Sequence, residues 1–170
     1  MNLRQLDAVS TAQLDQLADV LMDCVASGAS VSFMNPLTRE RALAFWQRVA
    51  DDVSAGKRLL LVAEDAQGIC GTVQLILDLP ENQPHRADVA KMLVHRRARR
   101  QGLGEALMKA AEETAKAAGR TLLVLDAVTG GDAARLYERL GWIRVGDVPD
   151  FALYPDGSFC STTYYYRRLT

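Results

Sequence analysis

Hydrophobic side chains recur along this chain with two different periods, and the periods predict an alternation of helices and strands. After Ser10 and Gln13, which form a candidate capping box, leucine and valine return every three or four residues until Gly28. Thr38 is a candidate N-cap for a second helix with similar spacing, and Trp46 lies on its apolar face. The N-terminal region therefore predicts a short strand, LRQL, followed by two amphipathic helices.

Apolar runs of strand length dominate the middle of the chain. LLLVAED and ICGTVQLIL, separated by a DAQG turn, predict an antiparallel hairpin, and the proline-broken LPENQPH predicts a loop. Residues 87–95 predict the next strand, 103–118 an amphipathic helix and 121–127 a short buried strand. Because a helix connects these two strands, we expect them to be parallel and the helix to pack over them.

The C-terminal part predicts one more helix, ending at Gly141, and two strands, WIRVGDV and SFCSTTYYYRRL. The turn sequence Pro155-Asp156-Gly157 lies between these strands and predicts a hairpin. The predicted order is β-α-α-β-β-β-α-β-α-β-β, with no repeat, low-complexity segment or linker. This order predicts a single domain over residues 1–170 and a mixed α/β (α+β) sheet rather than a doubly wound one.

Composition restricts the class of protein. Of 170 residues, 49% are hydrophobic and 24% are charged, which is typical of a globular domain. No window approaches the ~18 uninterrupted apolar residues of a membrane helix, and the N-terminus lacks the layout of a secretory signal. Three dispersed cysteines (Cys24, Cys70, Cys160) favour the reducing cytoplasm over a disulfide framework. His85 and His95 have no partners at metal-ligand spacing, so no metal site is expected.

Basic charge is concentrated in HRRARRQ, residues 95–101, although the net charge is only −1. Such a run is most often a solvated loop and less often a nucleic-acid patch. It overlaps RRQGLG, where a strand is expected to lead into a helix. N–H groups at a helix N-terminus form an anion site, and glycines let a ligand approach the backbone. The GxGxxG fingerprint would need glycine at Leu107, and no P-loop is present, so the remaining pattern is RxxGxG.

The segment KMLVHRRARRQGLGEALM resembles the acetyl-coenzyme A motif of the GNAT superfamily of acyltransferases. A second segment, ARLYERLGWIRVG, resembles the superfamily's AxxLYxxxGF motif, with Trp142 in place of phenylalanine. Arg96 stands where the superfamily commonly has proline, and Gly130 where it often has asparagine. The order of elements matches over nearly the whole chain. The resemblance therefore implies a GNAT-like, mostly antiparallel central sheet with one parallel β-α-β unit and helices on both faces.

The resemblance also implies how acetyl-CoA is bound. The motif strand would splay from its parallel neighbour and offer an N–H to the thioester carbonyl, and the first N–H groups of the following helix would hold the pyrophosphate. The residues implied in binding the coenzyme are Met92, Leu93, Val94, Arg99, Arg100, Gln101, Gly102, Leu103, Gly104 and Glu105. The three strand residues among them are also expected to pack in the core.

Acetyl transfer to an amine needs a base for the amine and a proton for the leaving thiolate. Tyr137 matches the motif tyrosine that can protonate the thiolate, although its helix face also predicts core packing. Asp126, at the end of a buried strand, and Asp88, at the start of its parallel neighbour, are candidate ammonium ligands and bases. Each could instead be a cap or a solvated strand end. His95 is a less suitable base because it precedes the arginines in a loop.

Four segments, GASVSFMNPL, RADVAKMLV, VLDAVTG and VGDVPDFALYPDGSF, resemble the tabtoxin-resistance-type acetyltransferases, which acetylate an amino group of a small amino-acid-like toxin. This resemblance implies an acetyl-CoA-dependent N-acetyltransferase acting on a small-molecule amine. The slightly negative net charge and the lack of a long apolar window argue against a nucleic-acid or membrane partner, and a monomer or homodimer is expected. Phe33 and Met34 could line the acceptor pocket. Alternatives are a peptide or protein N-acetyltransferase with an open acceptor groove, a non-catalytic acyl-CoA sensor, and a nucleic-acid module using HRRARRQ.

Overall fold

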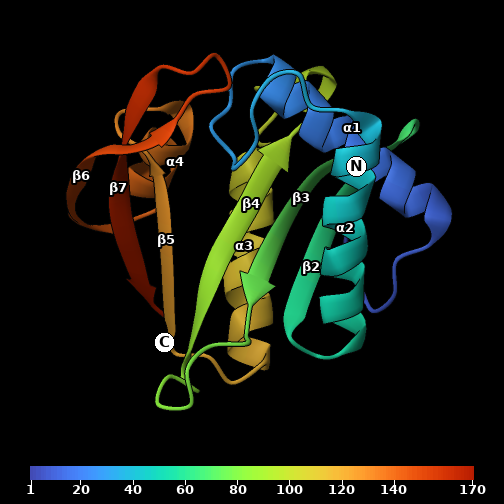
Figure 1. Ribbon diagram of the computed structural model, residues 1–170. Helices are drawn as coiled ribbons and strands as arrows, with labels where there is room; N and C mark the ends of the chain where they lie inside the picture. Colours follow the sequence, from blue (N-terminus) through green and yellow to red (C-terminus); the bar gives the residue numbers. More distant parts are fainter.

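A seven-stranded sheet forms the centre of the molecule, and helices cover both of its faces (Figure 1). The computed structural model describes all residues, 1–170. In chain order the elements are β1 (Asn2–Leu6), α1 (Thr11–Ala26), α2 (Arg39–Ser54), β2 (Arg58–Asp65), β3 (Gly68–Ile76), β4 (Arg86–Val94), the 3-10 turn η1 (Arg96–Ala98), α3 (Leu103–Ala117), β5 (Leu122–Val128), α4 (Asp132–Arg139), β6 (Ile143–Leu153) and β7 (Phe159–Arg168). This order of helices and strands is the one that the hydrophobic pattern predicts.

The strands are arranged in the order β1-β2-β3-β4-β5-β7-β6, and every neighbouring pair is antiparallel except β4 and β5. This parallel pair, joined through α3, confirms the expected β-α-β unit. Its ladder is short, because it joins only Arg86–Asp88 to Leu122–Val124. The predicted mixed and mostly antiparallel sheet is therefore confirmed.

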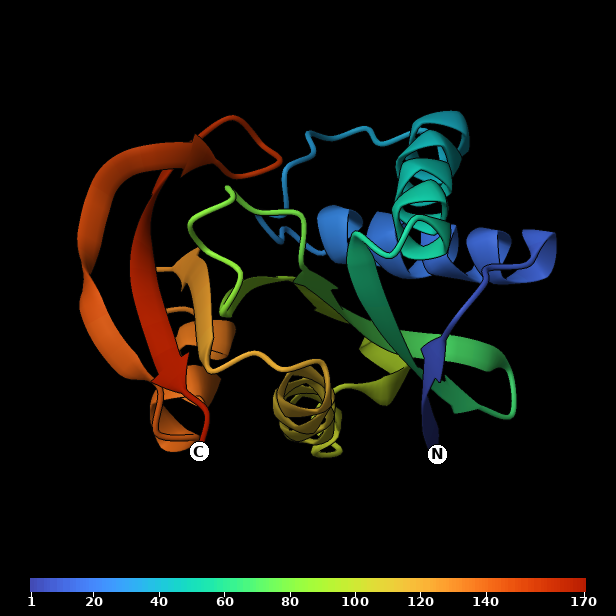
Figure 2. The ribbon, with the colours of Figure 1, turned by 90° about the horizontal axis from the view of Figure 1, so that it is seen from below.

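Each face of the sheet has its own hydrophobic core. Helices α1 and α2 pack on one face, and α3 and α4 on the other (Figures 1 and 2). The first core surrounds Trp46, which is fully buried and is therefore a packing residue. The second core includes Tyr137, Trp142 and Tyr165. The predicted placement of helices on both faces is confirmed.

The helix starts follow from their capping residues. Ser10 accepts a hydrogen bond from the Gln13 N–H, and the Gln13 side chain accepts one from the Ser10 N–H, which is the predicted capping box of α1. Thr38 accepts a hydrogen bond from the Arg41 N–H at the start of α2. Helix α3 has no such side chain, because its N-cap is Gly102. Its first N–H groups are therefore left without a side-chain acceptor.

Strand β6 is longer than the sequence predicts. It continues beyond WIRVGDV through PDFAL to Leu153, so the expectation that it ends near Val148 is wrong. Pro149 is tolerated because β6 is an edge strand and because the register shifts between Val148 and Ala152. With its bulges, β6 curves with β7 toward the side of the sheet that carries α1 and α2 (Figure 2).

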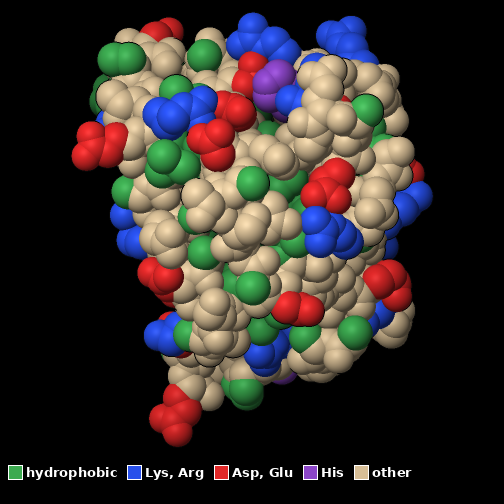
Figure 3. Space-filling model, turned by 90° about the vertical axis from the view of Figure 1, so that its right-hand side faces the viewer, with side chains coloured by type: hydrophobic (Ala, Val, Ile, Leu, Met, Phe, Trp, Pro, Cys, Tyr) green, Lys and Arg blue, Asp and Glu red, His purple; other side chains and the backbone are tan.

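The right-hand side of the molecule in Figure 1, at the β1–β2 edge of the sheet, carries interspersed acidic and basic side chains, with hydrophobic side chains in small separate areas (Figure 3). None of the helices combines the length and apolar character needed to span a membrane. No group of three or more His, Cys, Asp or Glu side chains is arranged to hold a metal ion.

Candidate active site

Strands β4 and β5 separate in the middle of the sheet. Their ladder ends at Asp88, whereas β4 continues to Val94. On its other side β4 remains paired with β3, but a bulge places Lys91 and Met92 opposite Val73. Lys91 has a φ of +51°, in the left-handed region. Beyond Asp88, the backbone N–H and C=O groups on the β5 side of β4 therefore have no strand partner.

The N-terminus of α3 presents unpaired backbone donors. The first helical hydrogen bond runs from the Ala106 N–H to the Gly102 oxygen (3.1 Å), so the N–H groups of Leu103, Gly104 and Glu105 precede it. Gly102 has a φ of +77°, and nothing lies within 4 Å of the position its Cβ would take. Open space and convergent N–H groups at the positive end of a helix dipole form a site suited to a pyrophosphate.

The two glycines of RRQGLG are required for different reasons. Gly102 adopts a left-handed conformation, which disfavours any residue with a Cβ. A Cβ on Gly104 would lie 3.1 Å from Leu136 Cδ2, so this glycine allows α3 to pack closely against α4. The Glu105 carboxylate forms an ion pair with Lys109, one turn further along α3 (2.6 Å). Its negative charge is thereby compensated, and its backbone N–H remains available to an anion.

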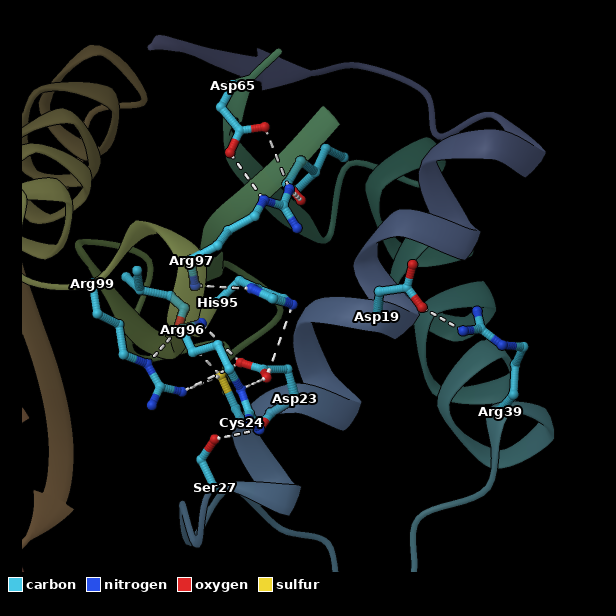
Figure 4. Close-up of polar contacts among 12 residues, drawn as sticks. Asp19, Asp23, Cys24, Ser27, Arg39, Asp65, His95, Arg96, Arg97 and Arg99 are labelled. Carbon is cyan, nitrogen blue, oxygen red and sulfur yellow. Dashed lines mark hydrogen bonds and ion pairs between the residues drawn. The ribbon is translucent and has the colours of Figure 1, made fainter. Parts of the chain in front are cut away.

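Two aspartates from distant elements neutralise most of the basic run (Figure 4). Asp23, on α1, accepts hydrogen bonds from the Arg96 N–H (2.8 Å) and the Arg96 guanidinium, and lies 3.5 Å from Arg99 Nη2. Arg97 pairs with Asp65 at the end of β2 (2.9 Å). These arginines are therefore structural, and the arrangement disfavours a nucleic-acid module that uses HRRARRQ.

Arg99 does not point toward the α3 N-terminus. Its Nε donates to the Val94 oxygen (2.9 Å), and its Nη2 lies 3.8 Å from Cys24 Sγ (Figure 4). Gln101 Nε2 donates to a backbone oxygen of η1 (3.2 Å), which also stabilises the turn. Arg100 is the arginine of the run without an ion pair; it is exposed and has a φ of +58°. Arg99 and Gln101 thus hold the loop, and Arg100 is free to approach an anion.

His95 is a loop residue with a structural role. Its Nδ1 accepts a hydrogen bond from the Arg97 N–H (3.1 Å), and its Nε2 lies 3.9 Å from Asp23 Oδ1. It therefore fixes η1 against α1.

The strand residues implied in coenzyme binding lie at the unpaired end of β4. Leu93 is buried in the core beneath α1 and α2, whereas Met92 and Val94 pack against the core beneath α3. The Val94 carbonyl already accepts hydrogen bonds from Arg99 and from the Cys24 thiol (3.6 Å). All three residues have the expected packing role, and the Val94 oxygen is engaged within the protein.

Tyr137 combines a buried ring with an unpaired hydroxyl. Its side chain is 5% exposed, and its ring packs against Trp142 and Tyr165 at centroid distances of 5.9 and 6.0 Å. No hydrogen bond within the protein involves its hydroxyl. Burial and, secondarily, the charge of Asp126 raise the pKa of Tyr137 well above its usual value. The phenol therefore stays protonated at neutral pH, as a proton donor must.

The structure brings Asp126 and Asp88 to the same face of the sheet. Leu123 and Leu125 belong to the α3–α4 core, so Asp126 faces the opposite side, toward α1 and α2. Asp88 pairs in register with Val124, two residues before Asp126, and shares that face. Asp126 accepts a hydrogen bond from Thr162 Oγ1 (2.6 Å) and has no ion pair, whereas Asp88 pairs with Arg86. Asp126 therefore keeps the more available charge.

Tyr164 belongs to the same site and was not singled out from the sequence. It lies opposite Asp126 in the β5–β7 ladder, and Phe151 packs edge-on against it at 6.1 Å. Burial, and then the charges of Asp126 and Asp88, raise the pKa of Tyr164. Residues 164–166 are all tyrosines. Tyr164 differs from the buried Tyr165 in lying opposite Asp126 on the neighbouring strand, and this pairing is not visible in the sequence.

Two loops meet over this face of the sheet. In the loop between α1 and α2, Ser30 Oγ donates to the Leu153 oxygen (2.8 Å), and the Asn35 N–H donates to the Pro155 oxygen (3.1 Å). Figure 2 shows this loop approaching the β6–β7 turn. Phe33, in the same loop, packs edge-on against an aromatic ring of α2 at 5.3 Å. The apolar loop thus closes one end of the face that carries the two aspartates.

Solved structures with the same fold include acetyltransferases. Ribosomal-protein-alanine N-acetyltransferase from Brucella melitensis superposes with a TM-score of 0.83 at 19% identity, over 99% of this chain and 100% of that chain. yncA from Salmonella typhimurium, whose structure contains its cofactor acetyl-CoA, superposes with a TM-score of 0.79 at 16% identity, over 100% of this chain and 95% of that chain. At these identities the similarity establishes the shared fold.

Sequence comparison identifies the family. Residues 56–144, which include the β4 bulge, the α3 N-terminus and Tyr137, match the family model of the acetyltransferase (GNAT) domain. The chain is also 30% identical over 128 residues to an uncharacterized N-acetyltransferase in the hisH-hisA intergenic region of Azospirillum brasilense, covering 74% of each chain. The chain therefore belongs to the GNAT family and is an N-acetyltransferase that uses acetyl-CoA.

Proposed function

We propose that the chain acetylates the primary amine of a small, amino-acid-like compound, such as a toxin or antibiotic, by direct attack of the amine on the thioester. The observation that carries this proposal is the pair of loops hydrogen-bonded to each other over the face with Asp126. A peptide substrate would need an open groove at this place. The resemblance to the tabtoxin-resistance-type segments supports the amino-acid-like class.

Acetyl-CoA supplies an acetyl group activated as a thioester. We assign its pyrophosphate to the N–H groups of Leu103, Gly104 and Glu105, with the Arg100 guanidinium free to add charge. The open turn at Gly102 fits this role because no atom fills the space beside it. The unpaired side of β4 offers backbone groups to the pantetheine arm and an N–H to the thioester carbonyl.

Proton transfer is assigned to residues on the two sides of the sheet. Asp126 binds the ammonium of the acceptor and takes its proton, directly or through a water molecule. As the amine nitrogen bonds to the carbonyl carbon and the C–S bond breaks, Tyr137 gives its hydroxyl proton to the sulfur. The nitrogen then loses its second proton, which passes through water to restore the Tyr137 hydroxyl, and Asp126 returns its proton to solvent, so that the products are the amide, the coenzyme thiol and one proton. Asp88 has a weaker role in holding the ammonium, because Arg86 already neutralises it.

A thiol-release assay with acetyl-CoA tests the proposal across a panel of amino acids, aminoglycosides, polyamines and short peptides. We expect turnover with a small amine, and mass spectrometry should locate one added acetyl group on its nitrogen. Turnover restricted to peptides would indicate a peptide N-acetyltransferase. Tight acetyl-CoA binding without transfer to any amine would indicate an acyl-CoA sensor instead.

A further inference from the structure

Lys91 is the lysine of this chain that has no acidic partner. Each of the other three lysines pairs with a carboxylate at 3.5 Å or less. Lys91 Nζ donates one hydrogen bond, to Ser32 Oγ (3.0 Å), and forms no ion pair. Burial and then the charge of Arg58 lower the pKa of Lys91, whereas the charge of Asp126 acts in the opposite direction without forming an ion pair; the balance disfavours the cation at this half-buried position. A bound anion would remove that penalty.

The fold determines where the Lys91 ammonium lies. Lys91 occupies the β4 bulge, and both Lys91 (φ +51°) and Ser32 (φ +80°) adopt left-handed conformations that residues other than glycine seldom adopt. The ammonium also lies 5.7 Å from the ring centroid of Phe45, on α2. Contacts from three elements therefore hold it on the α1–α2 side of the sheet, one residue before Met92 in the unpaired part of β4.

Other donors near Lys91 also lack acceptors. Gln74 is fully buried, and its Oε1 accepts a hydrogen bond from Arg58 (2.5 Å), which leaves its Nε2 without a partner. The Nε of Arg58 is buried without a partner as well, although another of its nitrogens pairs with Asp52 (2.9 Å). Gln74 lies opposite Ala90, the residue before Lys91. Both nitrogens are enclosed by protein atoms, so the contribution of this cluster to an anion at Lys91 is the positive charge of Arg58 rather than direct contact.

We propose that Lys91 binds a carboxylate of the acceptor, so that the acceptor is a zwitterionic amino acid whose ammonium faces Asp126 and whose carboxylate faces Lys91. Asp126 and Lys91 lie on the same face of the sheet, close enough for the charge of Asp126 to act on Lys91, but neither forms an ion pair with the other or with another side chain. A zwitterion bound between them would give each charge a direct partner. This inference rests on the proposed amine acetylation and adds the second charged group of the substrate. Polyamines and aminoglycosides carry only cations, which Lys91 and Arg58 would repel.

Binding to the wild-type protein provides a test that does not need turnover. Calorimetry in the presence of coenzyme A compares each of the standard L-amino acids with its carboxamide, which keeps the amine and removes the negative charge. We expect at least one amino acid to bind about tenfold or more tightly than its carboxamide, because hydrogen bonds to charged groups are the stronger ones. If every amino acid binds no better than its carboxamide, or none binds, the assignment of Lys91 is overturned.

Variants then test whether Lys91 is responsible. Lys91→Met should abolish the preference for the acid by raising its Kd and KM about tenfold or more, while values for the carboxamide change less than about twofold. Lys91→Arg should restore part of the preference because it keeps the charge. Lys116→Met, a change in the last turn of α3 at a lysine paired with Glu113 outside the site, is the control and should leave the preference unchanged. Equal losses for acid and carboxamide in Lys91→Met would show a merely structural role.

Failure of this inference is distinguishable from failure of the proposed function. Rapid acetylation of neutral amines or polyamines, with carboxylates disfavoured, would overturn the role of Lys91 and leave amine acetylation in place. Absence of transfer to any amine, together with Lys91-dependent binding of amino acids, would overturn the proposed function and leave the carboxylate site in place. If Lys91→Met does not fold, the wild-type comparison of acid and carboxamide still decides whether the site takes a carboxylate, and Lys91→Gln replaces Lys91→Met in the test of the lysine.

Discussion

Tyr137→Phe should remove a proton donor while leaving the packing in place. The ring is 5% exposed, and its hydroxyl has no hydrogen bond to lose. The free energy of unfolding should therefore fall by less than about 1 kcal/mol, the net value of a typical hydrogen bond. The kcat should fall by about ten- to a thousandfold, which corresponds to about 1.4–4 kcal/mol in the barrier. The affinity for acetyl-CoA should change little.

The pH dependence gives a second readout for Tyr137. Burial and the charge of Asp126 both disfavour the phenolate, so they raise the pKa of this tyrosine. A donor with a raised pKa stays protonated through neutral and mildly alkaline pH. The wild-type kcat should therefore not fall between about pH 7 and 9 through deprotonation of Tyr137. Tyr137→Phe should lower kcat by a similar factor at every pH in this range.

Tyr165→Phe is the matched control. The Tyr165 hydroxyl donates to Glu138 Oε1 (2.9 Å), and burial raises the pKa of Tyr165 to about 12. Losing this hydrogen bond should lower the free energy of unfolding by about 1 kcal/mol and leave kcat within about twofold. Steady-state kinetics and thermal unfolding of both variants separate the loss of a proton donor from the loss of a structural hydrogen bond. An unchanged kcat in Tyr137→Phe, or an equal loss in both variants, would refute the assignment of Tyr137 as the donor.

Four further changes separate coenzyme binding from acceptor binding. Asp126→Asn should raise the acceptor KM, lower kcat or do both, with acetyl-CoA affinity within about twofold, and Asp88→Asn should have a smaller effect because Arg86 already holds that carboxylate. Gly102→Ala should weaken acetyl-CoA binding and cost about 1–2 kcal/mol of stability, because its left-handed conformation disfavours a Cβ. Gly104→Val should lower both the thermal stability and the affinity for acetyl-CoA, because the added side chain would press on α4. Thermal unfolding and calorimetry measure the two quantities, and unchanged values of both would contradict this prediction.

The order of the elements could be predicted because it depends on local patterns. The capping box at Ser10 and Gln13 and the apolar spacing of α3 are readable within a few residues of sequence. The parallel pairing of β4 with β5 follows from the helix between them. The predicted end of β6 was wrong. Proline interrupts a central strand, but Pro149 is tolerated because β6 is an edge strand with a bulge. Whether a strand lies at an edge is a property of the whole sheet.

The candidate site was predicted where a motif marks it and missed where it depends on pairing. Tyr137 and Gly102 stand in motifs whose spacing is visible in the sequence, and their roles stay predictions. Tyr164 enters the site only because β7 places it opposite Asp126. Lys91 enters it because a bulge gives a lysine a left-handed conformation, which no local propensity favours. Tyr164 and Lys91 thus join the proposed acceptor site through the pairing of strands, which local sequence does not reveal.

In the basic run HRRARRQ, the number of arginines in the sequence differs from the net positive charge that the folded protein offers to a ligand. In the sequence, the arginines of HRRARRQ precede an anion site and predict phosphate contacts. In the structure, Asp23 and Asp65, which lie 73 residues before Arg96 and 32 residues before Arg97, take up much of that charge. The turn before α3 is thereby fixed, and the attraction for an anion is left largely to backbone N–H groups. Since these groups are positioned by the left-handed turn at Gly102, coenzyme affinity should depend on the shape of this turn more than on the number of arginines.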